Sequence, residues 1–203
     1  MPNQTFYNLP PQKQEAIEQA AIDEFAAYGF DASNMNRIVA AAKISKGSFY
    51  QYFVDKKDLY FHLVDTLTQK KRQHMQPFVD SYRQRTFSEN LVQMLDIGLA
   101  FSKSDPRLQR LAEDFATKHQ AFLSEFIQKY SPETADFYSM LLEDAEAKGQ
   151  LRTDLDIPVA ALLISTLINQ TVILLMKQQN MLSVEDVVIQ QTIAFIQYAV
   201  LKR

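Results

Sequence analysis

The sequence predicts an all-α protein in which a small N-terminal helical bundle precedes a larger helical body. Apolar residues recur at helical spacing along most of the chain, as in the stripe of Ile17, Ala21 and Phe25. No alternating pattern of useful length in the sequence indicates a strand. The 203 residues include only four glycines, and a proline or a capping residue stands before most apolar segments. These observations favour long helices joined by short turns.

The N-terminal bundle is predicted from its start and stop signals. Prolines open a first helix over 11–28, and Gly29 ends it. Three further helices begin after Asn34, Ser45 and Asp55, residue types that cap helix N-termini. The third of these four helices is very short. The fourth is long and runs toward Pro77, so it is expected to link the bundle to the body.

Five further helices are predicted in the body. They are expected over residues 88–102, from 106 onward, from 132 to near 149, over 157–180 and from 184 to about 201. Proline stands at or near the first helical position of three of them. We place the boundary between the two domains at the start of the long fourth helix, giving residues 1–55 and 56–203.

Charge is distributed unevenly, although the whole chain has a net charge of only −3. Residues 37–57 hold five basic side chains and one acidic one, a net charge of +4. Residues 105–156 hold six basic and eleven acidic side chains, a net charge of −5. Because attraction to phosphate falls off within about 8–10 Å at physiological salt, the local charge matters more than the total. The basic segment is therefore compatible with nucleic-acid binding.

The basic segment reads as a helix, a tight turn and a second, very short helix that begins after Ser45. A helix that short is not stable alone. Its polar and aromatic side chains, among them Lys46, Tyr50 and Gln51, suit phosphates and base edges. Phe49 and the following Phe53 supply its apolar side. This is the layout of a helix-turn-helix that reads double-stranded DNA, with the short helix as the recognition helix.

The residues themselves carry a family resemblance. The run from 38 to 53 reads Ile-Val-Ala-Ala-Ala-Lys-Ile-Ser-Lys-Gly-Ser-Phe-Tyr-Gln-Tyr-Phe, and Lys56 and Leu59 follow it. With the first-helix residues 16–30, it resembles the DNA-binding domain of the TetR family of bacterial transcriptional repressors. The segment 149–156 is similar to the usual entry into that family's penultimate helix. The resemblance implies a homodimer on a partly palindromic operator, released by a small-molecule inducer bound in the C-terminal domain.

The resemblance and the local sequence together give a set of expected DNA contacts. The predicted DNA-binding residues are Asn34, Asn36, Arg37, Lys43, Ser45, Lys46, Gly47, Ser48, Tyr50, Gln51, Tyr52 and Lys56.

Two of these positions depart from the family pattern. Lys43 replaces a turn glycine that adopts the left-handed conformation in the family, which costs a non-glycine residue about 1 kcal/mol. The turn is therefore expected to be either strained or differently shaped. Arg37 replaces an acidic residue in the first turn of its helix. Each replacement adds a cation that is able to contact a phosphate.

Three positions allow a structural interpretation beside the functional one. Tyr52 fits either a core aromatic or a phosphate contact. Gly47 marks either a loose helix start or a close approach of backbone to DNA, since glycine costs about 1 kcal/mol in a helix relative to alanine. Lys56 is either an ordinary solvated lysine or a phosphate ligand at a helix start, where the dipole alone disfavours a cation.

The last two helices predict the dimer interface. Both are strongly apolar, and the last carries two adjacent apolar stripes, so a pair from each copy would make a four-helix bundle. The predicted interface residues are Leu167, Leu174, Val188, Ile189, Ile193, Ile196 and Val200. Asn169 and Gln170 interrupt the penultimate helix, and a buried amide needs a partner, which could be a backbone group, a two-fold mate or a ligand.

The middle of the body is rich in Phe and Met, which line adaptable apolar pockets but are more often core. We expect a pocket between the helix after Asp55 and the helix after Asp156, suited to an apolar or cationic aromatic compound. The predicted ligand-binding residues are Met94, Phe101, Phe115, Phe122, Tyr138 and Asn169.

Other classes of protein are disfavoured. The chain has no cysteine, its three histidines share no metal-ligand spacing, and no acid–base–nucleophile constellation appears, so we predict no cofactor, no metal and no enzyme. The polar N-terminus does not resemble a secretory signal, and the apolar 158–176 segment is interrupted by polar residues. We predict a cytoplasmic regulator without a membrane span. An all-helical scaffold or carrier without DNA binding is the alternative.

Overall fold

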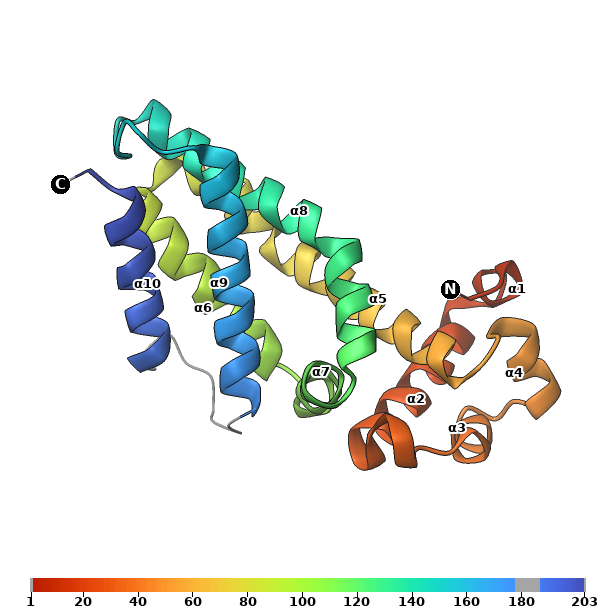
Figure 1. Ribbon diagram of the computed structural model, residues 1–203. Coiled ribbons are helices and arrows are strands. Elements are labelled where there is room, and N and C mark those ends of the chain that lie inside the picture. The colour runs from red at the N-terminus through yellow and green to blue at the C-terminus, as the bar shows by residue number, and fades with distance from the viewer. Residues whose placement is uncertain (1, 178–186, 203) are drawn as a thin grey trace. The chain divides into compact units, whose positions relative to one another are not determined.

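The computed structural model describes residues 2–177 and 187–202, and over these residues the chain is helical without a named strand (Figure 1). Its elements are α1 (Gln4–Tyr7), α2 (Pro11–Ala32), α3 (Met35–Ala41), α4 (Lys46–Tyr52), α5 (Lys56–Val79), the 3-10 turn η1 (Tyr82–Gln84), α6 (Phe87–Lys103), α7 (Pro106–Lys118), α8 (Gln120–Ala147), α9 (Ile157–Lys177) and α10 (Val187–Val200). The predicted all-α class is confirmed.

The chain divides into two compact units. The first holds residues 1–73 and 102–115, and the second holds residues 74–101 and 116–203. The first unit therefore includes most of α5 and α7 in addition to the N-terminal helices. The functional boundary that we placed at residue 55 stays a prediction.

An aromatic core holds the first unit together. Phe25 of α2, Phe49 of α4 and Tyr60 of α5 are almost fully buried. The ring centroids of Phe25 and Tyr60 lie 4.8 Å apart in an edge-to-face arrangement, which aromatic pairs prefer. A small bundle can bury enough surface in this way because each aromatic ring removes a large apolar area from water.

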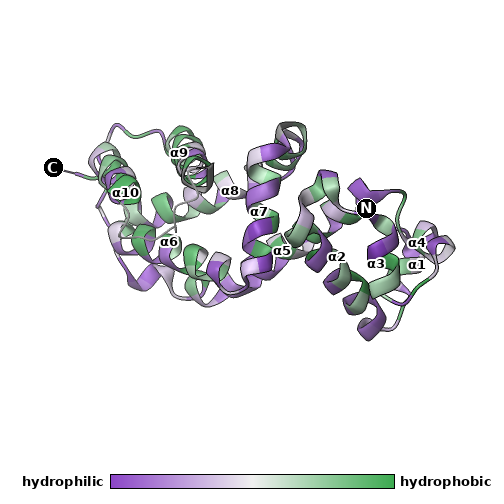
Figure 2. Ribbon diagram, turned by 90° about the horizontal axis from the view of Figure 1, so that it is seen from below, coloured by the Kyte–Doolittle hydropathy of each residue, from purple (hydrophilic) through white to green (hydrophobic). Residues whose placement is uncertain are grey.

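The second unit has a mainly aliphatic core. Buried residues of α6, α8, α9 and α10 form one cluster, and α8 and α9 pack closely against each other. Figure 2 shows α9 and α10 coloured as hydrophobic along much of their length. By length and composition alone, residues 157–174 of α9 would suffice to cross a membrane.

Several helix boundaries differ from the predicted ones. The short helix α1 was not foreseen. Gly29 interrupts the helix as predicted, with a non-helical backbone at φ 70°, and a further helical turn, to Ala32, follows it. The helix predicted to start at 132 does not, because α8 begins at Gln120 and contains Pro132. Likewise α5 continues past Pro77 to Val79. The predicted start of the last helix near residue 184 lies outside the described residues.

Candidate nucleic-acid interface

The turn between α3 and α4 forms from local hydrogen bonds. The Oδ1 atom of Asn34 accepts the backbone N–H of Asn36 at 2.8 Å and caps α3. The Oγ atom of Ser45 accepts the backbone N–H of Ser48 at 3.0 Å and caps α4. Between the two helices, Lys43 adopts the left-handed conformation at φ 54°. Both predicted caps are confirmed, and of the two shapes left open for the turn, Lys43 has the strained, left-handed one.

Helix α4 has one buried side and one exposed side. Phe49 and Phe53 are fully buried and stack with ring centroids 5.4 Å apart. Tyr50 lies on another side and is 51% exposed. Its ring touches Phe49 edge-to-face, which orients it without burying it. The exposed side of α4 therefore presents an aromatic ring and polar groups that the core does not use.

Most predicted DNA-binding residues lie exposed around α3, the turn and α4. The exposed ones are Asn34, Asn36, Arg37, Lys43, Ser45, Lys46, Gly47, Tyr50 and Gln51. Ser48 and Lys56 are half-buried. Tyr52 is only 7% exposed and its ring packs near Phe6, so burial gives it a core role in addition to any contact that its hydroxyl makes.

The described part of the chain does not require a glycine at position 47 of α4. A Cβ atom placed on Gly47 would find only the Oγ atom of Ser45, at an ordinary contact distance of 3.7 Å. The backbone of Gly47 is not in the left-handed region. Alanine would therefore fit the folded chain, so a loose helix start and a close approach of backbone to DNA both stay open at Gly47.

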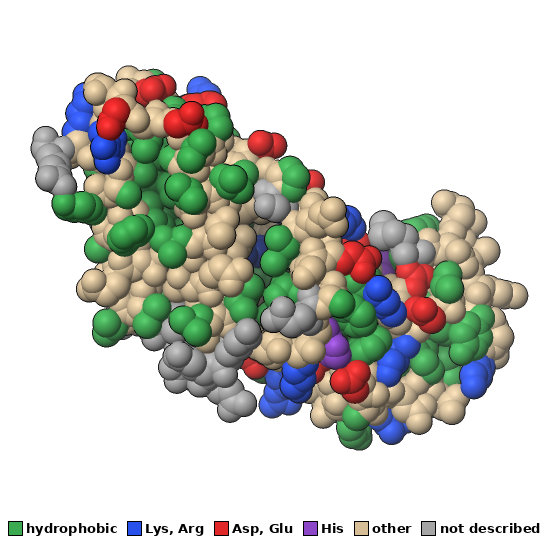
Figure 3. Space-filling model, in the orientation of Figure 1, with side chains coloured by type: hydrophobic (Ala, Val, Ile, Leu, Met, Phe, Trp, Pro, Cys, Tyr) green, Lys and Arg blue, Asp and Glu red, His purple; other side chains and the backbone are tan. Residues whose placement is uncertain are grey.

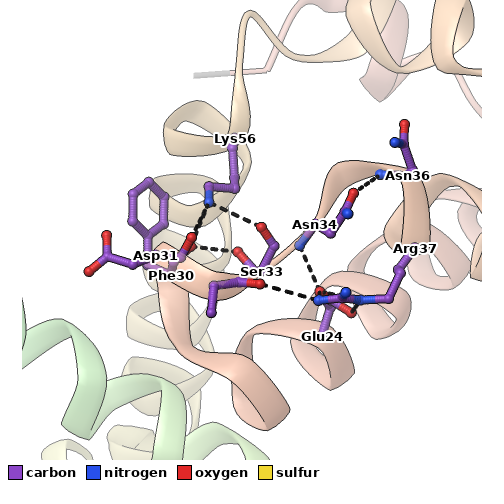
Figure 4. Close-up of polar contacts among 9 residues, drawn as sticks. Glu24, Phe30, Asp31, Ser33, Asn34, Asn36, Arg37 and Lys56 are labelled. Atoms are coloured by element: carbon purple, nitrogen blue, oxygen red, sulfur yellow. Dashed lines mark hydrogen bonds and ion pairs between the residues drawn. The ribbon is translucent and has the colours of Figure 1, made fainter.

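Arg37 is bound within its own domain. Its Nε atom donates to both carboxylate oxygens of Glu24, each at 2.9 Å. Its Nη2 atom donates to the carbonyl oxygen of Ala32 at 3.2 Å (Figure 4). It also lies over the ring of Tyr28, 4.2 Å from the centroid. The predicted phosphate contact of Arg37 must therefore share the guanidinium with an internal ion pair.

Glu24 is the centre of this arrangement and was not foreseen. It is only 7% exposed, and its carboxylate also accepts the backbone N–H of Asn34 at 2.7 Å. Burial opposes ionisation, but the bonds from Arg37 and Asn34 outweigh it, so the pKa of Glu24 lies below its ordinary value. Glu24 thereby fixes the start of α3 to α2.

Lys56 differs from the prediction in its contacts. Its Nζ atom donates to the carbonyl oxygens of Phe30 and Ser33, the latter at 3.2 Å, and to that of Asp31 at 3.3 Å (Figure 4). It also lies 4.6 Å from the centroid of the Phe30 ring. These carbonyls belong to the end of α2 and the residue that follows it, where a cation is favoured by the helix dipole. Lys56 therefore braces the corner between α2 and α3.

A carboxylate of α7 also binds the end of α2. Asp114 accepts the backbone N–H of Phe30 at 3.0 Å and the hydroxyl of Tyr60 at 3.1 Å. A Cβ atom at Gly29 would lie 2.8 Å from this carboxylate, so the position requires glycine for space as well as for its positive φ. Burial, followed by the charge of Asp114, raises the pKa of Tyr60. Sequence patterns gave no signal for Asp114, because it lies 84 residues from Phe30.

The predicted ligand-binding residues are divided between the two units. Met94 and Tyr138 are buried in the core of the second unit, whereas Phe115 is buried in the first, against Tyr60. Phe101 packs on His74 and Phe122 stacks on His119. Asn169 is exposed.

A small apolar cavity lies elsewhere in the second unit. It is lined by Leu95, Leu99, Ile168, Thr171, Val172, Ile189 and Thr192. Its volume is about 10 Å³, the room of a single water molecule. The Oγ1 atoms of Thr171 and Thr192 face each other at 3.4 Å.

The predicted interface residues fall into two groups. Ile189, Ile193, Ile196 and Val200 are at most 4% exposed in the core of their own chain, so assigning them to a dimer interface was wrong. The stripe that they form on α10 faces inward. Leu167 is half-buried, while Leu174 and Val188 are 49% and 40% exposed. Asn169 and Gln170 share the exposed side of α9.

The exposed apolar residues of α9 and α10 were partly missed. They are Val159, Leu162, Leu163, Leu174, Val187, Val188, Phe195 and Tyr198, and each is at least 40% exposed. Figure 3 shows hydrophobic side chains gathered over these two helices. We call this set the α9–α10 face. From Ile157 to Leu174 and from Val187 to Val200 the sequence contains no charged residue.

Residues 17–63 match the model of a family described as bacterial regulatory proteins, tetR family. The chain is 23% identical over 140 residues to the HTH-type transcriptional regulator YhgD of Bacillus subtilis, covering 69% of this chain and 72% of that one. It is 29% identical to a TetR family transcriptional regulator of Chloroflexus aurantiacus, with a TM-score of 0.57 and full coverage of both chains. The transcriptional regulator FadR of Bacillus subtilis, solved in complex with stearoyl-CoA, shares the fold at 19% identity and a TM-score of 0.66, covering 92% of this chain and 97% of that one. These similar proteins are named as transcriptional regulators, not as enzymes.

Proposed function

We propose that this chain is a member of the tetR family of bacterial regulatory proteins, and that it is a cytoplasmic repressor that a small ligand releases from a partly palindromic operator. The observation that carries the DNA-binding part is the exposed side of α4. Lys46, Tyr50 and Gln51 extend from a helix whose other side is fully used by the core. The exposed Lys43 on the neighbouring turn would add attraction to phosphate.

A homodimer would form through the α9–α10 face. This face is apolar and uncharged, with the amides of Asn169 and Gln170 among its aliphatic side chains. A large exposed apolar patch marks a surface that another molecule covers. A second copy suits it because two uncharged faces meet without burying an unpaired charge, and each amide then has a partner of its own kind across the two-fold axis.

A membrane is the competing occupant of the α9–α10 face. Only 28% of the apolar window in α9 is buried within the chain, so exposure by itself does not distinguish the two. Flotation with liposomes and light scattering separate them. We expect a dimer that stays in the aqueous fraction, and a chain that floats with the liposomes would contradict this assignment.

The ligand would be an apolar or cationic aromatic compound bound in the second unit. The apolar lining of the small cavity supports an apolar ligand, as does the stearoyl-CoA bound by the FadR neighbour. A drug-sized ligand needs at least about 300 Å³. Binding would therefore have to separate α9 and α10 from α6 along this cavity. By linkage, a ligand that favours the released form lowers operator affinity by its preference for that form.

The DNA-binding proposal is tested by selecting duplexes from a random library with the wild-type protein and titrating the recovered operator. We expect specific binding that weakens steeply as salt concentration rises. Tyr50→Ala should weaken operator binding by about 1–3 kcal/mol while leaving the melting temperature unchanged. A chain that binds no duplex at low salt would instead be a helical scaffold or carrier.

The ligand proposal needs a separate experiment. Long-chain acyl compounds and cationic aromatics are screened for a rise in melting temperature, and each hit is titrated into the protein–operator complex. An inducer raises the melting temperature and lowers operator affinity. Compounds that stabilise the protein but leave operator affinity unchanged would contradict an inducer site.

A further inference from the structure

The segment before the helix-turn-helix packs onto the end of α4. Helix α1 contacts α4, and the side chain of Phe6 is fully buried. The Phe6 ring centroid lies 4.9 Å from that of Phe53, 5.0 Å from that of His62 and 6.3 Å from that of Tyr52. Residues 2–9 thus form part of the same aromatic core that supports the recognition helix.

The segment also supplies hydrogen-bond donors to the last carbonyls of α4. The backbone N–H of Asn3 donates to the carbonyl oxygen of Tyr52 at 2.8 Å. The Nδ2 atom of Asn3 donates to the carbonyl oxygen of Gln51 at 3.1 Å, and the hydroxyl of Thr5 donates to the same oxygen. A helix leaves its last four carbonyls without partners inside the helix, so these donors complete the C-terminal end of α4.

The segment is itself fixed to α2. The Nε2 atom of Gln14 donates to the carbonyl oxygen of Leu9 at 2.8 Å and to that of Tyr7 at 3.3 Å. Gln14 belongs to α2, so a continuous set of contacts leads from α2 through residues 3–9 to the end of α4. The other end of α4 is capped by its own Ser45.

This arrangement matters because α4 is seven residues long and cannot hold its own position. The carbonyls that Asn3 and Thr5 bind belong to Gln51 and Tyr52, which directly follow the exposed Tyr50. Fixing the backbone at these residues fixes the direction in which the side chains of Tyr50 and Gln51 leave the helix. Specific contacts to base edges depend on that direction, whereas attraction to phosphates does not.

We propose that Asn3, Thr5 and Phe6 are positioning residues for sequence-specific DNA binding, acting through the C-terminal end of α4. The proposal rests on the proposed function, in that α4 must read DNA. It extends beyond it because the segment lies outside residues 17–63, which match the family model. Held in this way, Tyr50 and Gln51 would contact the base edges of the operator.

The test compares substitutions that remove single donors. Thr5→Val removes the hydroxyl donor and keeps the shape, and Asn3→Ala removes the side-chain donor. Gln4→Ala is the matched control, because Gln4 is exposed and its side chain bonds only within α1 and its C-cap, to Asn8. Each variant is titrated with the selected operator and with a random duplex, well below its melting temperature. Exchange of the amide hydrogens of residues 50–53 is measured on the free proteins.

Thr5→Val and Asn3→Ala should each weaken operator binding by about three- to tenfold, because binding must then supply the free energy with which one hydrogen bond held the end of α4 in place. Binding to the random duplex and the salt dependence of binding should stay as in the wild type. Amide exchange at residues 50–53 should accelerate. Thr5→Ser, which keeps the hydroxyl donor, should bind the operator as the wild type does. Gln4→Ala should behave as the wild type.

Two results would overturn the proposal. If Thr5→Val and Asn3→Ala lower the melting temperature but bind the operator as the wild type does, the segment has a purely structural role. If Gln4→Ala weakens operator binding as much as they do, the donors to α4 are not the cause. A wild type that selects no duplex at all overturns the proposed function itself, and this proposal with it.

Discussion

Helices α4 and α9 both present an exposed side, but they are held in different ways. Helix α4 has seven residues, and side chains or backbone groups of other segments bind the carbonyls at its end. Helix α9 has 21 residues and is held mainly by apolar packing against α8 and α10. Directional hydrogen bonds fix an orientation, whereas packing fixes a volume. Small changes near α4 should therefore alter DNA affinity, and changes near α9 should alter folding or assembly.

The sharpest test within the second unit is a pair of adjacent substitutions on α10. Ile196 is 2% exposed and Phe195 is 65% exposed. Ile196→Glu would bury an unpaired charge in the aliphatic core and should cost more than about 4 kcal/mol, enough to unfold the unit. Circular dichroism and thermal melting measure this. A folded Ile196→Glu protein would contradict the inward orientation of this stripe.

Phe195→Glu should have a different outcome from its neighbour. The side chain lies on the α9–α10 face, so the charge can remain in water as long as the chain is monomeric. We expect an intact helical monomer by light scattering, with operator affinity reduced by about 100-fold or more because two half-sites are no longer bound together. If Phe195→Glu is still a dimer, the dimer interface lies on another surface.

In the first unit, Glu24→Gln tests whether directional bonds hold α3. The substitution removes the negative charge that accepts hydrogen bonds from Arg37 and from the backbone N–H of Asn34. The free energy of unfolding should fall by about 1–3 kcal/mol. Because the pKa of Glu24 is lowered on folding, its contribution is present above its ordinary pKa of 4.5 and is lost as pH falls through the folded value.

The pH dependence supplies the matching measurement for Glu24→Gln. The difference in unfolding free energy between wild type and variant should shrink as pH falls below about 4.5. Urea melts between pH 3 and pH 7 measure it. If the difference in unfolding free energy stays constant over this pH range, ionised Glu24 does not stabilise the junction of α2 and α3.

The smallest expected effect is at Gly47, where stability and binding should change in opposite directions. Gly47→Ala should raise stability by up to about 1 kcal/mol, because alanine favours a helix and has space here. The added methyl group should nevertheless weaken operator binding if DNA backbone approaches this position. A variant that is more stable and binds equally well would favour the interpretation of Gly47 as a loose helix start.

The sequence by itself determined the features that depend on near neighbours. The caps Asn34 and Ser45 were predicted correctly, because each depends on bonds within about three residues. The helical class was also predictable, since it follows from apolar spacing along each segment. The predicted exposure of Tyr50 beside buried Phe49 rests on the same local periodicity.

Only the tertiary structure decided what distant segments do to one another. Lys56 binds carbonyls 23–26 residues away, Asp114 binds Phe30 across 84 residues, and Thr5 binds Gln51 across 46. Both stripes of α10 contain large apolar side chains, and packing decides that Ile193 and Ile196 face inward while Phe195 faces outward. Periodicity shows which residues share a side of a helix, but the choice of neighbour depends on how the whole chain closes its core.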